Sequence, residues 1–124
     1  MDSRIRESFD KQGLMTTLGV RIESVQKGCV TLSAPIRAEA SQQHGFAHAG
    51  VTFALGDSAA GYTALTVMPA GSEVLTSEMK IHLLAPARGD ARSAAQFLLR
   101  SYSTVTDFAR FRGWSTSVPL ATAV

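Results

Sequence analysis

The stretch AGVTFALGDSAAGYTALTV, residues 49–67, decides the fold. It is apolar, rich in small side chains and carries a single charged residue, Asp57. At 3.6 residues per turn it can form about five turns of helix, and Pro69 and Gly71 are predicted to stop it. A helix that is apolar on every side is expected to be buried. The rest of the chain must therefore provide elements that enclose it.

The segments before this helix predict a helix followed by a β-hairpin. Residues 3–18 fit a helix that Ser3 can cap and that Gly13 ends or bends. Residues 19–27 and 29–36 place apolar side chains at alternate positions, as strands do. Lys27 and Gly28, where the two runs meet, fit a turn. These two runs are expected to pair as antiparallel strands.

The remaining segments carry weaker signals. Residues 37–48 are polar and irregular and predict a loop, whereas 73–85 alternate like a strand that ends in a turn over 86–90. Residues 94–102 fit either a strand or a short helix, and 118–124 have weak β character. A sheet that wraps one apolar helix buries that helix economically, so the sequence predicts an α+β fold with an antiparallel sheet.

Length and composition limit the possible function. The chain has 124 residues, which fits one domain over 1–124. No uninterrupted apolar run approaches the roughly 20 residues of a membrane-spanning helix, and the N-terminus lacks the apolar core of a secretion signal, so we expect a cytoplasmic protein. Its arginines are scattered, which argues against nucleic-acid binding. The lone Cys29 excludes an internal disulfide, and the three histidines lack the spacing of metal ligands.

Asp57 is the first candidate for a functional residue. Burying an unpaired carboxylate is costly or forces it to take up a proton, so such a group is seldom kept in an apolar helix without a reason. The alternative is that Asp57 caps a neighbouring helix or pairs with a basic residue.

The predicted start of the same helix is the second candidate. Backbone N–H groups without partners and the positive end of the helix dipole gather at His48, Ala49 and Gly50, where they can stabilise an oxyanion. Alternatively, His48 simply caps or packs at this end. Asp57 lies about 10–12 Å further along the helix axis, so one substrate reaches both points on one helix only with difficulty.

Three segments together resemble one known family. HAGVTFALGDSAAGYTA is similar to the His-Gly-Gly-x-x-x-x-x-x-Asp-x-x-x-x-x-Ala segment of the PaaI-like (phenylacetate-degradation) hotdog thioesterases. SEMKIHLLAPARGD and TLGVRIESVQKGCVTLSAPI resemble the strand and turn that follow it and the first hairpin of that family. The resemblance runs from about Leu14 to Asp90. It implies a hotdog fold and a homodimer or homotetramer, with the site at the subunit interface.

The resemblance also implies roles for single residues. Asp57 matches the nucleophile or general base, the N–H of Ala49 with that of Gly50 polarises the thioester carbonyl, and Thr76 helps to position water. Gln42, or Gln43 beside it, orients water or the acyl group, His48 has a structural or orienting role, and Arg88 meets coenzyme A phosphates. The candidate catalytic residues are therefore Asp57, Ala49, Gly50, Gln42 and Thr76, and the candidate substrate-binding residues are His48, Gln43, Ser58 and Arg88.

The expected activity is hydrolysis of an aryl- or medium- to long-chain acyl-CoA to free acid and CoA. It needs no metal and no cofactor, since coenzyme A is part of the substrate. Two alternatives are a non-catalytic acyl-CoA-binding hotdog module, and a hotdog hydratase or dehydratase that uses His44 or His48. Phe46, Phe53 and Tyr62 suggest an apolar or aromatic acyl group, although core packing explains them equally well.

Two features depart from the family pattern. Ala49 stands where the motif has its first glycine, which keeps the N–H donor but adds a methyl group beside the thioester. After Asp90 the chain is rich in Arg and Ser and alternates poorly. We hypothesise that this region has diverged, is rearranged or arises from a shifted reading frame. Missing strands there would leave the long helix partly uncovered.

Overall fold

The computed structural model describes residues 2–76, 79, 83, 86–87, 93–98, 106–111 and 114–119. The helices and strands, in chain order, are α1 (Ser3–Asp10), α2 (Gly13–Leu18), β1 (Arg21–Gln26), β2 (Cys29–Ala34), the 3₁₀ helix η1 (Ala38–Ala40), α3 (Ala49–Leu65), β3 (Ser93–Leu98), β4 (Thr106–Phe111) and β5 (Trp114–Pro119).

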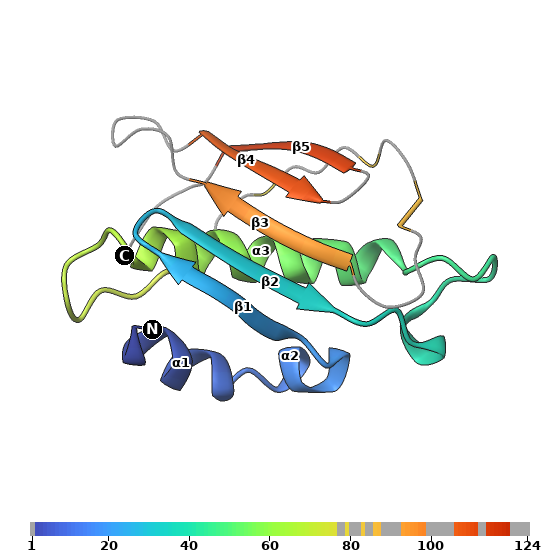
Figure 1. Ribbon diagram of the computed structural model, residues 1–124, viewed down its shortest axis with the longest axis horizontal. Coiled ribbons are helices and arrows are strands. Elements are labelled where there is room, and N and C mark those ends of the chain that lie inside the picture. Colours follow the sequence, from blue (N-terminus) through green and yellow to red (C-terminus); the bar gives the residue numbers. More distant parts are fainter. Residues whose placement is uncertain are drawn as a thin grey trace.

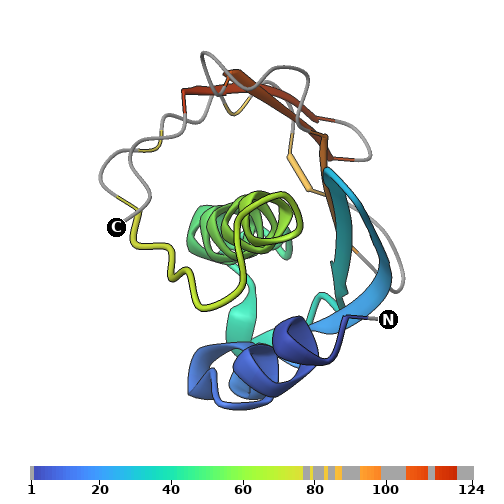
Figure 2. The same ribbon diagram turned by 90° about the vertical axis from the view of Figure 1, so that its left-hand side faces the viewer.

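The strands form one antiparallel sheet in the order β1-β2-β3-β4-β5. Helix α3 lies between β2 and β3 in chain order and along one face of the sheet, where it packs mainly against these two strands (Figure 1). Seen end-on, the sheet curves around α3, and α1 and α2 lie below both (Figure 2). The arrangement confirms the predicted α+β fold, an antiparallel sheet wrapped around one long helix.

The β1–β2 hairpin follows the sequence pattern with one irregularity. Gly28 forms the turn with a φ of 75°, a left-handed conformation that glycine adopts without strain. The pairing shifts between Ile22 and Ser24, which marks a β-bulge. The extra residue lets Ile22 and Val25, three positions apart, both pack against the core. In β2, Val30, Leu32 and Ala34 are buried as their alternation predicts.

The N-terminal segment forms two helices where one helix over residues 3–18 was predicted. The cap of α1 is Asp2, whose carboxylate accepts a hydrogen bond from the Arg4 N–H at 3.0 Å, so the prediction that Ser3 caps the helix is wrong. An acceptor one residue earlier reaches this N–H, and Ser3 joins the helix instead. Gly13 begins α2, and Gly19 ends it in a left-handed conformation with a φ of 68°.

The core fills the space between α1, α2, β2 and α3. The largest fully buried side chains are Ile5, Met15, Leu32, Leu55, Val30, Thr52 and Thr63. Polar groups tie the hairpin to the end of α3: the Gly28 N–H donates to Thr66 Oγ1 at 2.7 Å, and the Val30 N–H donates to Thr63 Oγ1 at 3.2 Å. The helix is therefore held in register with the sheet.

The region after Asp90 contributes three strands. Of the two possibilities for 94–102, the strand is observed, because β3 pairs with β2 over residues 93–98. The predicted tail strand at 118–124 begins earlier, as β5 at Trp114, and residues 120–124 lie outside the described part. The predicted strand over 73–85 also falls largely on undescribed residues. Strands are therefore present where we considered that they could be missing.

Within the described residues, no helix has the length and apolar character needed to cross a membrane.

Candidate active site

Helix α3 provides the platform for the site. It covers Ala49–Leu65, two residues shorter at its end than the 49–67 predicted from the sequence. Its buried residues fall on one half of the helix at 3.6 residues per turn. On the other half Gly50 and Phe53 are exposed and Asp57 is half-buried, and Ala49 is exposed as the first residue of the helix. Within the single chain, the expectation of burial on all sides is therefore met on one side only.

Asp57 lies near the middle of this uncovered half. Thr76, in the extended segment after α3, donates a hydrogen bond from Oγ1 to Asp57 Oδ1 at 2.5 Å. The structure thus brings together two residues that the sequence analysis proposed separately. Among the described residues Asp57 has no ion-pair partner and caps no helix, which removes both structural alternatives within that part of the chain.

The start of α3 is fixed by His48. Its Nδ1 accepts a hydrogen bond from the Gly50 N–H at 2.8 Å, and its carbonyl oxygen accepts one from the Val51 N–H at 2.9 Å. A Cβ at position 50 would lie 3.0 Å from His48 Nδ1, so glycine makes room for the cap. The Ala49 N–H finds no acceptor among the described residues. The N–H at position 49, and not that at position 50, is therefore available to a ligand.

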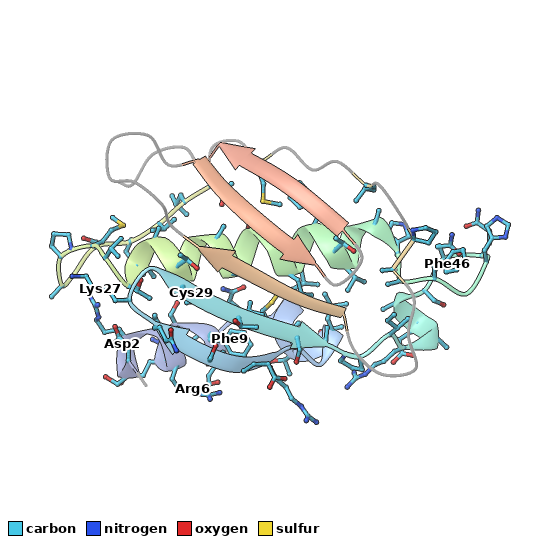
Figure 3. All side chains as sticks on the ribbon, turned by 45° about the horizontal axis from the view of Figure 1, so that its top comes forward. Asp2, Arg6, Phe9, Lys27, Cys29 and Phe46 are labelled. Carbon is cyan, nitrogen blue, oxygen red and sulfur yellow. The ribbon has the colours of Figure 1, made fainter. Side chains whose placement is uncertain are left out.

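The loop before α3 holds Gln42. Its Oε1 accepts hydrogen bonds from the backbone N–H groups of His44 and, at 3.4 Å, of Phe46, while the Gln42 N–H donates to the Phe46 carbonyl at 2.8 Å. The side-chain NH₂ of Gln42 has no partner within the described part of the chain. Gln43 is exposed. Figure 3 shows Phe46 in this loop, at the end of the molecule where α3 begins.

Ser58 and Tyr62 are occupied by contacts to the N-terminal helices. Ser58 Oγ donates to Gln12 Oε1 at 3.3 Å, and Gln12 Nε2 donates to Tyr62 Oη at 2.5 Å. Ser8 Oγ also lies 3.3 Å from the Tyr62 hydroxyl, and the Tyr62 ring packs at a tilt on Phe9. Gln12 was not predicted from the sequence, where it is only a polar residue immediately before a glycine. Of the two explanations offered for Tyr62, core packing is the one observed.

Two further points concern Arg88 and metal ions. Arg88 lies outside the described residues. Its neighbour Ala87 is buried and accepts a hydrogen bond from the Ala47 N–H at 3.3 Å, which places this part of the predicted turn beside the start of α3. In the described ranges no group of three His, Cys, Asp or Glu residues is arranged to hold a metal ion.

Asp57 and the Ala49 N–H cannot meet on one helix. Eight residues separate them, which corresponds to about 12 Å along the axis. A thioester carbonyl is far smaller than this gap. The Ala49 N–H and the Asp57 carboxylate of one helix therefore do not act on the same thioester carbonyl.

Comparisons with known proteins show the family of the chain. The family model of a domain of unknown function, DUF4442, matches residues 10–112. A curated protein of Halobacterium salinarum, named "Putative esterase", is 30% identical over 106 residues, which cover 82% of this chain and 70% of that protein.

Two solved structures are also similar to this chain in sequence and fold. A thioesterase family protein from Silicibacter pomeroyi is 36% identical, with a TM-score of 0.77 over 98% of this chain and 93% of that one. A variant of the phenylacetic acid degradation protein PaaI from Thermus thermophilus is 26% identical, with a TM-score of 0.66 over 90% of this chain and 97% of that one.

Proposed function

Because the chain belongs to the DUF4442 family and to the PaaI-like hotdog thioesterases, we propose that this thioester hydrolase acts on an acyl-CoA, with an aryl or a medium- to long-chain acyl group. The observation that carries the proposal is Asp57, a half-buried carboxylate on the uncovered half of α3 with Thr76 as its hydrogen-bond donor.

Asp57 is suited to promote attack on the thioester carbonyl. Thr76 engages Oδ1 and leaves Oδ2 able to accept a proton from water or to attack the carbonyl carbon itself. When water attacks, its proton passes to Asp57, a C–O bond forms and the carbonyl π electrons move onto oxygen. Collapse of this oxyanion breaks the C–S bond and releases CoA as the thiolate, which then takes up a proton.

The Ala49 N–H is the proposed donor to the oxyanion. It lies at the positive end of α3, is exposed and has no acceptor among the described residues. Because it lies too far from Asp57 of its own helix, the proposal requires a dimer in which one subunit supplies Ala49 and its partner supplies Asp57. A tetramer built from such dimers would preserve this pairing.

Two further residues have proposed roles next to this pair. The unpartnered NH₂ group of Gln42 is able to donate to the acyl oxygen or to the attacking water. Phe53 precedes Asp57 by one helical turn on the same uncovered half and is 44% exposed, so it is placed to contact the acyl group. Tyr62 and Ser58 face the N-terminal helices instead and are not assigned to the acyl site.

The test is release of free CoA from a panel of acyl-CoAs that includes phenylacetyl-CoA and medium-chain thioesters. Asp57→Asn, which keeps the shape of the side chain, is expected to lower kcat by about 10³-fold. The matched control is Glu7→Gln, which removes an exposed carboxylate from α1 and should leave kcat unchanged. Undiminished turnover in Asp57→Asn would contradict the role proposed for Asp57. A folded dimeric wild type that binds acyl-CoA without turnover would favour the binding-module alternative.

A further inference from the structure

A concave site that Asp57 does not line lies beside the N-terminal helices. A pocket of about 690 Å³ opens between the α1–α2 pair and the start of β1. Arg6 of α1, Arg21 of β1 and Arg37 after β2 line it, together with one acidic residue, Asp10. Three arginines from separate parts of the chain thus line a space within the range of about 300–1,000 Å³ that small-molecule sites occupy.

The positive charge of this pocket is largely uncompensated. Asp10 Oδ1 lies 3.9 Å from Arg6 Nη1, too far for a charge-assisted hydrogen bond, and the Asp10 side chain is 62% exposed. The guanidinium of Arg21 forms no ion pair or hydrogen bond within the described residues. A surface ion pair such as Arg6–Asp10 contributes little to the free energy of unfolding. Folding therefore gives no reason to gather three like charges here.

One of the arginines is held in place by the backbone. Arg37 Nη1 donates to the Thr17 carbonyl oxygen at 3.3 Å, and its guanidinium lies over Gly19. A Cβ at position 19 would collide with this guanidinium, and Gly19 has a φ of 68°. The same glycine therefore ends α2 and seats Arg37, and within the described residues one hydrogen bond engages one of the five N–H donors of this guanidinium.

We propose that this pocket binds the phosphate groups of a nucleotide. Planar guanidinium groups that present several N–H donors match phosphate oxygens, and the pocket has more room than inorganic phosphate alone requires. Phe9 and Ile22 line the apolar part of the wall, where a base or ribose can pack. The nucleotide is either a free molecule or the phosphorylated adenosine end of coenzyme A, and only this second source rests on the proposed function.

The binding test is calorimetric titration of the full chain with adenosine 3′,5′-bisphosphate. We expect binding to the wild type, and binding at least about tenfold weaker both for adenosine, which lacks the phosphates, and in Arg21→Glu. Lys27→Glu is the matched control: it makes the same change of charge in the exposed β1–β2 turn outside the pocket (Figure 3) and should bind like the wild type. Arg6→Gln is a second, milder variant should Arg21→Glu fold poorly.

Three results would overturn the proposal: no binding of the bisphosphate at millimolar concentration, wild-type affinity in both arginine variants, or an equal loss in Lys27→Glu. The last result would show general charge attraction without a site. The titration does not depend on turnover, because Asp57→Asn should bind the bisphosphate as the wild type does. A failed thioesterase assay and a failed nucleotide site are therefore distinguishable.

Turnover of acyl-CoA then identifies the source of the nucleotide. A raised KM in Arg21→Glu with unchanged kcat assigns the pocket to the adenosine end of the substrate. Unchanged KM, with nucleotide binding lost, assigns it to a free nucleotide. Both results retain the site.

Discussion

The two halves of α3 differ more than their sequence suggests. One half is buried against the sheet and the N-terminal helices, through Val51, Thr52, Leu55, Gly56, Ala59, Ala60, Tyr62 and Thr63. The other half carries exposed Gly50 and Phe53 and the half-buried Asp57. Both halves are apolar, yet only the first contributes to the core of the single chain. In the proposed dimer, the apolar side chains of the second half contact the partner subunit and the acyl group.

The first prediction tests this difference through stability. Leu55→Ala removes a fully buried side chain and should lower the free energy of unfolding by about 3 kcal/mol. Phe53→Ala removes a larger side chain from the uncovered half and should cost less than about 1 kcal/mol in the monomer. Urea denaturation at low protein concentration measures both values. Equal losses in the two variants would contradict the division of α3 into a buried and an uncovered half.

The same pair of variants separates stability from activity. Phe53→Ala should raise KM for acyl-CoA or weaken the dimer, because its contacts lie with the acyl group and the partner. Leu55→Ala should leave KM unchanged in the fraction that remains folded.

The second prediction concerns how α3 is attached to the N-terminal helices. Tyr62→Phe removes the hydroxyl that accepts from Gln12 Nε2 and should cost about 1–2 kcal/mol of unfolding free energy, since a half-buried amide loses its partner. Ser8→Ala removes only the 3.3 Å contact to the same hydroxyl and should cost less. Thermal unfolding followed by circular dichroism measures both. A larger effect from Ser8→Ala would mean that the Gln12 bond is unimportant.

The sequence predicted the fold well where a local pattern determines it. The start of α3, the strands of the hairpin and the turn at Gly28 follow from apolar periodicity and from one glycine. Strand β4 had no clear pattern in the sequence. It forms because β3 and β5 offer backbone partners on both sides, a tertiary cause that periodicity does not report.

The site was predicted less completely. Asp57 and Thr76 were both proposed, but their hydrogen bond depends on the path of the chain after α3. The attachment of Ser58 and Tyr62 to Gln12 depends on how α1 and α2 dock, across more than 40 positions of sequence. Contacts of this kind follow from packing, which neither spacing nor composition encodes.

The third and smallest predicted effect concerns His48, for which the sequence left both a capping and a catalytic role open. His48→Ala should lower the unfolding free energy by about 1 kcal/mol, because the Gly50 N–H loses its acceptor. His48→Asn should retain most of that stability, since asparagine is a good N-cap residue. His44→Ala, in the exposed loop nearby, is the control and should change nothing.

Turnover of the two His48 variants then separates the roles. If His48 acts only through the cap, kcat in His48→Asn should match the wild type, because the start of α3 and the Ala49 N–H keep their positions. A loss of kcat in His48→Asn at unchanged stability would instead give the imidazole a direct part in catalysis. The start of α3 would then carry a second chemical group, and the hydratase alternative would regain support.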